Sequence, residues 1–169
     1  AHGLPSVLGD YLLRHGRTGE TLALIAGQPL TNRRTAAASA LAADYLAMKD
    51  ATRLLMVGTG AMAPELVNAH ATVRPIREVR VWGRSPEKAE ALAETLHAQG
   101  YRAEAVADLQ SGVRWAEVIS CATMSTESLI RGEWLAPAQH VALVGAFKPT
   151  MRETDDPCVQ RAQLFCDTF

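Results

Sequence analysis

The spacing of hydrophobic residues changes near residue 50 and divides the chain into two parts. In the first part, the apolar runs Tyr11–Leu13 and Thr21–Ile25 flank a segment rich in turn residues, a pattern that predicts a β-hairpin. Closely spaced alanine and leucine residues follow, and they predict one long helix that begins after an N-cap at Thr31 and ends near Lys49. A hairpin and one helix are too small to form a domain, so we expect them to be the closing part of a larger one.

In the second part, short apolar strands alternate with helical segments. We expect strands at residues 54–57, 78–82, 103–106, 118–120 and 141–144. The helices expected between them cover residues 63–73, 86–99 and 109–115. Strands that are apolar throughout, joined by helices at this spacing, form parallel βαβ units in a sheet that helices cover on both faces. The predicted fold class is therefore α/β, a doubly wound parallel sheet of the Rossmann type with part of a second domain.

The clearest chemical motif is Gly58-Thr59-Gly60-Ala61-Met62-Ala63, which directly follows the first of these strands and opens a helix. Gly58 permits a tight turn, Gly60 lets the backbone approach a pyrophosphate, and Ala63 keeps the helix close to the strand. The amide groups and the positive dipole end of the helix attract phosphate. We therefore expect residues 58–62 to bind a dinucleotide cofactor; the alternative is an ordinary strand-to-helix turn.

The end of the second strand indicates which dinucleotide is bound. Sites for NAD usually have an acidic residue there, whereas this chain reads Trp82-Gly83-Arg84-Ser85, and its first acid is Glu87. Arg84 can pair with a 2′-phosphate, and Ser85 can donate a hydrogen bond to it. Lys88 falls in the first turn of the next helix, where a bound phosphate would offset the unfavourable helix dipole. The sequence therefore favours NADP(H) over NAD(H), the alternative being that Arg84 and Lys88 are solvated surface charges.

The carboxyl ends of two further strands carry small residues. Cys121, Ala122 and Thr123 follow the fourth strand, and Gly145 follows the fifth. Ligands of parallel sheets bind at the carboxyl ends of the strands, so we expect these residues to lie along the ribose and nicotinamide of the cofactor. Plain packing of small residues is the alternative.

Two arginines, Arg33 and Arg34, fall in the first turn after the expected cap at Thr31. Two cations at the positive end of a helix cost roughly 0.3–1 kcal/mol each, so we expect at least one of them to have an anionic partner. A substrate carboxylate, a cofactor phosphate and a surface carboxylate all satisfy this expectation, and composition does not decide among them.

The composition argues against several classes of function. The chain has 169 residues, a net charge of −1 and no basic stripe with interleaved aromatic residues, which argues against nucleic acid as a partner. It has no run of about 18 apolar residues for a membrane span and no recognisable secretory signal. Its three cysteines lack metal-ligand spacing and its five histidines are scattered, so we expect no metal site and free thiols in a cytoplasmic protein.

Four segments together resemble the ornithine cyclodeaminase/mu-crystallin family: residues 32–43 (rich in arginine and alanine), the glycine turn, residues 81–85, and residues 144–153. The resemblance implies that residues 51–153 form the dinucleotide-binding domain, residues 1–50 form part of a substrate and dimerisation domain, and residues 154–169 begin a segment that returns to it. It also implies a homodimer. On the family pattern we expect the first part of the substrate domain to be absent from this chain.

The same resemblance gives roles to individual residues. Arg34 matches the family arginine that holds the substrate carboxylate, and Thr35 matches the adjacent residue near the cofactor. Cyclodeaminases carry an aspartate two residues after the glycine that ends the fifth strand, where this chain has Phe147. Phenylalanine neither accepts a proton nor orients a water, so a cyclodeaminase is disfavoured.

The resemblance then implies an NADPH-dependent oxidoreductase that reduces a cyclic ketimine carboxylate, Δ1-pyrroline-2-carboxylate or Δ1-piperideine-2-carboxylate, to the L-imino acid. Arg34 would anchor the carboxylate, and Phe147 would form an apolar wall of the substrate pocket. Two alternatives stay open. One is an NAD-dependent ornithine cyclodeaminase, which releases ammonia from the amino acid, and the other is a non-catalytic protein that binds NADPH or a small ligand.

Overall fold

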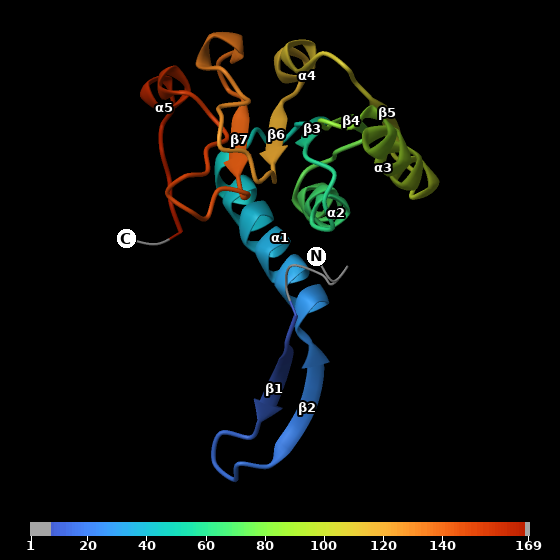
Figure 1. The fold of residues 1–169 in the computed structure, drawn as a ribbon, viewed down its shortest axis with the longest axis vertical. Helices are drawn as coiled ribbons and strands as arrows, with labels where there is room; N and C mark the ends of the chain where they lie inside the picture. The colour runs from blue at the N-terminus through green and yellow to red at the C-terminus, as the bar shows by residue number, and fades with distance from the viewer. Residues whose placement is uncertain (1–7, 168–169) are drawn as a thin grey trace.

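Five short strands pair side by side in one parallel sheet (Figure 1). The computed structural model describes residues 8–167, so the outer ends of the predicted segments 1–50 and 154–169 lie outside it. The strands are β3 (Arg53–Val57), β4 (Glu78–Trp82), β5 (Arg102–Ala105), β6 (Val118–Cys121) and β7 (His140–Leu143), in the spatial order β5-β4-β3-β6-β7. The strand order reverses between β3 and β6, which confirms the predicted doubly wound sheet.

Helices cover both faces of this sheet. They are α1 (Gly27–Leu46), α2 (Ala63–Val73), α3 (Pro86–Ala98), α4 (Leu109–Trp115), the 3-10 turn η1 (Gly132–Trp134) and α5 (Asp156–Arg161). The first three pack on one face, and α4 and η1 pack on the other. The helices predicted in the second part are confirmed. In contrast, η1 and α5 span three and six residues, too few for a periodic pattern to predict them.

The apolar strands are buried from both sides, as the sequence predicts. Alternating residues of β3 divide between two cores: Leu54 and Met56 belong to the core beneath α1, α2 and α3, and Leu55 and Val57 to the core beneath α4. All four side chains are fully buried. Each contributes roughly 1.5–3 kcal/mol through the removal of its apolar surface from water.

The long helix α1 begins at Gly27, so the prediction that Thr31 is its N-cap is wrong. The reason is a contact across the hairpin: β2 runs directly into α1, and the Gly27 N–H donates to the Gly9 carbonyl at 2.7 Å. A Cβ on Gly27 would lie 2.4 Å from that oxygen, so only glycine allows the approach. Arg33 and Arg34 therefore lie in the second turn of α1, and the helix-dipole argument for an anionic partner does not apply to them.

The buried guanidinium of Arg74, just after α2, caps the other end of α1. It donates to the carbonyls of Ala43 (2.7 Å), Asp44 (2.6 Å) and Ala47 (3.0 Å), and to the Asp44 carboxylate (2.8 Å). The hydrogen bond from Arg74 holds the pKa of Asp44 below its usual range. Arg74 thus places a cation and its donors at the negative end of α1, where the last carbonyls lack the full set of helical partners. This cap joins α1 to the second part of the chain.

Small residues let α1 approach α2 closely. Ala36, Ala40 and Ala43 are buried along the shared face, and next to them the Ser39 hydroxyl lies 3.3 Å from Nε2 of His70 on α2. His70 is fully buried, and desolvation, with His140 and Arg74 nearby, lowers its pKa to about 4. His70 is therefore neutral near pH 7 and acts here as a packing residue.

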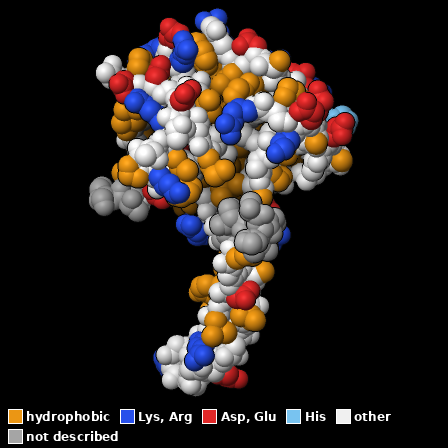
Figure 2. Space-filling model, in the orientation of Figure 1, with side chains coloured by type: hydrophobic (Ala, Val, Ile, Leu, Met, Phe, Trp, Pro, Cys, Tyr) orange, Lys and Arg blue, Asp and Glu red, His pale blue; other side chains and the backbone are white. Residues whose placement is uncertain are grey.

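The predicted hairpin is present and projects away from the sheet (Figures 1 and 2). It consists of β1 (Asp10–Arg14) and β2 (Thr21–Ala26), which pair antiparallel. Both faces are apolar: Leu12 pairs with Leu24 on one, Tyr11 pairs with Ile25 on the other, and Leu12, Leu24 and Tyr11 are exposed. Within residues 8–167, no helix is both long and apolar enough to span a membrane.

Candidate functional site

The glycine turn joins β3 to α2 at the carboxyl edge of the sheet. Gly58 has a φ of +114°, and a Cβ on it would lie 2.5 Å from the carbonyl oxygen of Ala122. The Gly58 N–H donates to the Trp82 carbonyl (2.9 Å), and the Ala122 N–H donates to the Val57 carbonyl (2.9 Å). The turn is thus held against both β4 and the loop after β6, and the fold itself requires glycine at position 58.

Gly60, in contrast, faces open space. It is exposed, and a Cβ on it would meet no atom within 4 Å. Helix α2 begins at Ala63, and its N-cap Met62 makes no side-chain hydrogen bond, so no side chain caps the first amides. Thr59 is half-buried and Ala61 is exposed beside this surface. An open backbone surface before the uncapped positive end of a helix fits a pyrophosphate, the predicted ligand.

The end of β4 lies against the same turn. A Cβ on Gly83 would come within 2.7 Å of the Thr59 methyl group, so Gly83 permits this contact, a role that the motif alone did not indicate. Arg84 and Lys88, predicted to meet a 2′-phosphate, are both exposed. Neither forms an ion pair with any of residues 8–167. Both cations are therefore free to meet an anionic ligand at this edge.

The hydroxyl of Ser85 already has partners within the chain. It accepts from the Lys88 N–H (3.4 Å) as the N-cap of α3 and donates to the Glu87 carboxylate (2.6 Å). The hydrogen bond from Ser85 lowers the pKa of Glu87, so this carboxylate is charged near pH 7. The edge thus presents a carboxylate that can accept from a ribose 2′-hydroxyl next to an arginine that can bind a 2′-phosphate.

The predicted residues after β6 divide into buried and accessible ones. The thiol of Cys121 is fully buried, and burial raises its pKa well above the usual range, so it stays protonated. Its carbonyl accepts from the Val144 N–H within the sheet (2.9 Å). Cys121 therefore belongs to the core, and its thiol does not line the site. Ala122 and Thr123 are half-buried and continue from it past the glycine turn.

The loop after β7 is fastened to the loop after β6. A Cβ on Gly145 would lie 2.1 Å from the Thr123 carbonyl oxygen, so glycine allows this approach. The carboxylate of Glu153, which is 2% exposed, accepts hydrogen bonds from both residues. The sequence reasoning gave Glu153 no role, because its partners lie 30 and 8 residues away and no local pattern brings them together.

Helix α1 runs beside the glycine turn. The Asn32 side-chain amide lies 3.5 Å from the Ala61 carbonyl, and Arg33 lies 3.9 Å from Glu65 in the first turn of α2. The predicted anionic partner of Arg33 is thus a carboxylate of the chain itself, in an exposed pair of little energetic value. Thr35 is half-buried on the same helix.

Arg34 lies on another face of α1. Helical residues follow each other at roughly 100°, which places Arg34 almost opposite Asn32. Arg34 is exposed and shares its face with Leu30, Leu41 and Tyr45, which are exposed as well. The structure therefore does not bring Arg34 into contact with the glycine turn, and it aims the predicted carboxylate anchor away from the sheet.

Phe147, in the loop after β7, is 71% exposed and has the Lys148 ammonium 5.5 Å from its ring centre. Met124, in the loop after β6, is similarly exposed. The arrowheads of β6 and β7 point to the side from which the hairpin projects (Figure 1). These large apolar side chains therefore lie in loops at the carboxyl edge, the edge where ligands of such sheets bind.

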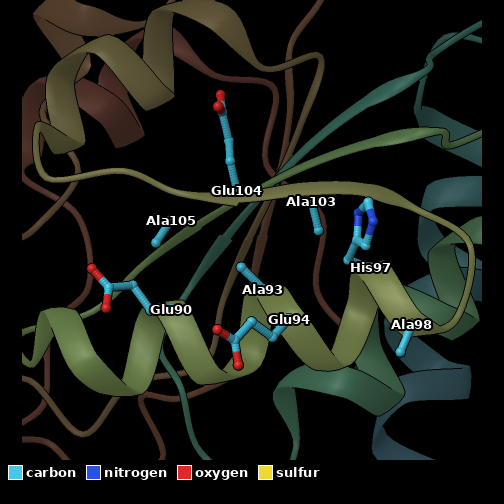
Figure 3. A pocket seen from close by; sticks show the side chains of 8 residues that line it. All are labelled: Glu90, Ala93, Glu94, His97, Ala98, Ala103, Glu104 and Ala105. Atoms are coloured by element: carbon cyan, nitrogen blue, oxygen red, sulfur yellow. The ribbon is translucent and has the colours of Figure 1, made fainter.

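A shallow groove of about 410 Å³ lies away from this edge, between α3 and the edge strand β5 (Figure 3). Glu90 and Glu94 line it from α3, with His97 near its end, while Glu104 points to the far side of β5. Acidic side chains repel a phosphate, so the groove does not fit the dinucleotide. Within the described part of the chain, no three potential ligand side chains come together to hold a metal ion.

Comparisons with known proteins place the chain in a family. The model of the ornithine cyclodeaminase/mu-crystallin family matches residues 1–169. The chain is 42% identical to Δ1-pyrroline-2-carboxylate reductase of Paracoccus denitrificans over 169 residues, which are 99% of this chain and 54% of that protein. It is 33% identical to the ketimine reductase mu-crystallin of Rattus norvegicus over 167 residues, 99% of this chain and 52% of that protein.

One solved structure is similar over nearly the whole chain. Thermococcus litoralis Δ1-pyrroline-2-carboxylate reductase, in complex with NADH and L-proline, matches with a TM-score of 0.89 and 32% identity. The match covers 95% of this chain and 50% of that one. The chain thus spans about half the length of the relatives it matches.

Proposed function

Because this chain belongs to the ornithine cyclodeaminase/mu-crystallin family, we propose that its protein is an oxidoreductase that uses NADPH to reduce a cyclic ketimine carboxylate. The substrate would be Δ1-pyrroline-2-carboxylate or Δ1-piperideine-2-carboxylate, and the product the L-imino acid. The observation that carries the proposal is the open glycine turn at Gly60, in a chain whose relatives include named reductases of this substrate class. Phe147, in place of an aspartate, favours reduction over deamination.

The nicotinamide cofactor supplies the hydride, and the residues of the chain bind and orient the reactants. The turn at Gly58–Met62 holds the pyrophosphate, and the loops after β6 and β7 carry the other half of the cofactor. Arg34, on the exposed face of α1 that the rest of the substrate domain would cover, would anchor the substrate carboxylate by a bidentate pair, and Phe147 would form an apolar wall beside the ring. Protonation of the imine nitrogen makes its carbon the better hydride acceptor, so the pocket needs to hold the iminium form.

The preference for NADP(H) depends on two side chains of opposite charge at the end of β4. Arg84→Ala should weaken NADPH binding by about 10- to 100-fold and change NADH binding little, because a charge-assisted pair with the 2′-phosphate is lost. Glu87→Gln should shift the preference further toward NADPH, since it removes a negative charge 2.6 Å from the Ser85 hydroxyl. Fluorescence titration of each variant with both cofactors measures the change.

Arg102→Ala is the matched control for the arginine variant, because Arg102 is exposed on the edge strand β5, away from the glycine turn. It should leave both affinities unchanged. Equal weakening of NADPH and NADH binding by Arg84→Ala would contradict the assignment of Arg84 to the 2′-phosphate.

The proposed domain organisation explains the apolar surfaces of the first part. A two-stranded hairpin with apolar residues on both faces is marginal by itself. Leu30, Leu41 and Tyr45 expose a second apolar surface on α1. We propose that residues 1–50 belong to a substrate and dimerisation domain, completed by further polypeptide, in a homodimer. Sedimentation measurements on the protein at several concentrations test the dimer.

The substrate is tested by offering the protein ornithine and the two cyclic imines in separate assays. The proposal predicts NADPH oxidation with at least one imine and no ammonia from ornithine. Ammonia release from ornithine would establish the cyclodeaminase, and cofactor binding without turnover of either imine would favour a non-catalytic binding protein.

A further inference from the structure

The carboxylate of Glu153 lies buried between the loops that follow β6 and β7. One oxygen accepts from the N–H and the hydroxyl of Thr123, at 2.7 and 2.8 Å, and the other accepts from the Gly145 N–H at 3.0 Å. Only 2% of the residue is exposed, and no cationic side chain among residues 8–167 pairs with it. A buried carboxylate without a cation is costly unless hydrogen bonds satisfy it, and here three donors do so.

The backbone of Glu153 is anchored independently of its side chain. Its carbonyl accepts from the N–H groups of Leu129 (3.1 Å) and Ile130 (2.9 Å), and Thr154 next to it pairs with Ile130 in a parallel bridge. The carboxylate therefore extends from a fixed segment toward two loops.

The two loops are also in close contact with each other and with the glycine turn. A Cβ on Gly145 would lie 2.1 Å from the Thr123 carbonyl and 2.6 Å from a Glu153 oxygen, and the Ala122 carbonyl lies against Gly58. Glu153 holds together the loops after β6 and β7, on one side of the point where the strand order reverses.

This location belongs to one half of a dinucleotide site. In a doubly wound sheet, the adenosine half binds on the side of β3 and β4, and the second mononucleotide half binds across the switch point, here beside β6 and β7. Thr123 and Gly145 lie on the second side, and Arg84 and Gly60 lie on the first. Glu153 therefore lies on the side of the nicotinamide half.

We propose that Glu153 is a positioning residue for the nicotinamide half of the cofactor: its carboxylate holds Thr123 and Gly145 in the geometry that receives the nicotinamide ribose. The inference rests on the proposed dinucleotide site. Glu153 itself stays beneath the loops and touches neither cofactor nor substrate.

The test compares the whole cofactor with its adenosine half. In Glu153→Gln, volume is kept, but an amide group replaces one acceptor oxygen and faces an N–H donor. NADPH affinity should fall about tenfold, the equivalent of one lost hydrogen bond. Affinity for adenosine 2′,5′-bisphosphate, which lacks the nicotinamide half, should stay within roughly twofold, because the adenosine half binds beside β3 and β4, across the switch point from Thr123 and Gly145. Glu127→Gln is the matched control, because Glu127 carries an exposed carboxylate in the loop after β6. It should change neither the NADPH affinity nor the bisphosphate affinity.

If Glu153→Gln weakened the binding of NADPH and of the bisphosphate equally, Glu153 would have a general structural role and the inference would be overturned. Unchanged affinity for both ligands would also overturn it. If Glu153→Gln does not fold, Glu153→Asp keeps the charge with a shorter reach, and the same selective loss of NADPH affinity is expected of it. A wild-type chain that binds neither ligand would refute the dinucleotide site itself, a result distinct from failure of the Glu153 inference alone.

Discussion

Gly60→Val should abolish measurable dinucleotide binding and leave the fold intact. A Cβ at this position would meet no atom within 4 Å, so a side chain starts into open space. The same space is where the pyrophosphate must approach the amides at the start of α2. Loss of several charge-assisted hydrogen bonds corresponds to an affinity at least about 100-fold lower. Unfolding free energy should change by only about 0.5 kcal/mol, as for other exposed positions.

Two other glycines serve as controls for this variant. Gly58→Ala should destabilise the protein, because Gly58 combines a φ of +114° with a Cβ position 2.5 Å from the Ala122 carbonyl. Gly16→Val, in the hairpin turn, should change neither stability nor binding, since it too meets no atom within 4 Å. Titration with NADPH and NADH, together with chemical denaturation, separates the two effects. Wild-type affinity in Gly60→Val would place the dinucleotide elsewhere.

Arg74→Ala should have the largest effect on stability, a loss of about 3 kcal/mol or more of the free energy of unfolding. The substitution removes the buried donors to the carbonyls of Ala43, Asp44 and Ala47, of which that of Ala47 has no other donor among residues 8–167, and it empties the volume of a long buried side chain. It also removes the contact that joins the end of α1 to α2. Denaturant unfolding followed by circular dichroism measures the loss.

Lys49→Ala is the control, because Lys49 also pairs with the Asp44 carboxylate (3.5 Å) but is exposed. Its removal should cost less than about 1 kcal/mol, as for other surface pairs. Because Lys49 also donates to the Asp44 carbonyl (2.8 Å), similar losses for the two variants would mean that the contacts with Asp44, rather than the hydrogen bonds to the Ala43 and Ala47 carbonyls, are what Arg74 contributes.

Local patterns predicted much of this molecule. The apolar strand at 54–57, the glycine turn after it and the Ser85 cap of α3 depend on residues that are neighbours in sequence, so the sequence predicts their structure. The start of α1 was mispredicted at Thr31, because its first amide is satisfied by Gly9 across the hairpin. A local capping rule has no access to such a partner.

The parts of the site that were missed depend on distant contacts. Glu153 gains its role only when β6 and β7 bring Thr123 and Gly145 together. Cys121 was predicted along the cofactor from its place after a strand, whereas the pleat of β6 turns its thiol into the core. The position of a residue in the sequence predicts that it lies at the carboxyl edge of the sheet, but not which of its atoms face the ligand.

The most direct test of the proposed function is the absorbance of NADPH at saturating Δ1-pyrroline-2-carboxylate, followed in parallel with NADH and with Δ1-piperideine-2-carboxylate. We expect NADPH to be consumed only when an imine is present, with one L-imino acid formed for each NADPH consumed. At equal cofactor concentration, the rate with NADPH should exceed the rate with NADH. Faster consumption of NADH would contradict the assignment of Arg84 to the cofactor phosphate. Ammonia release from ornithine, with neither cofactor consumed by any imine, would contradict the reductase itself.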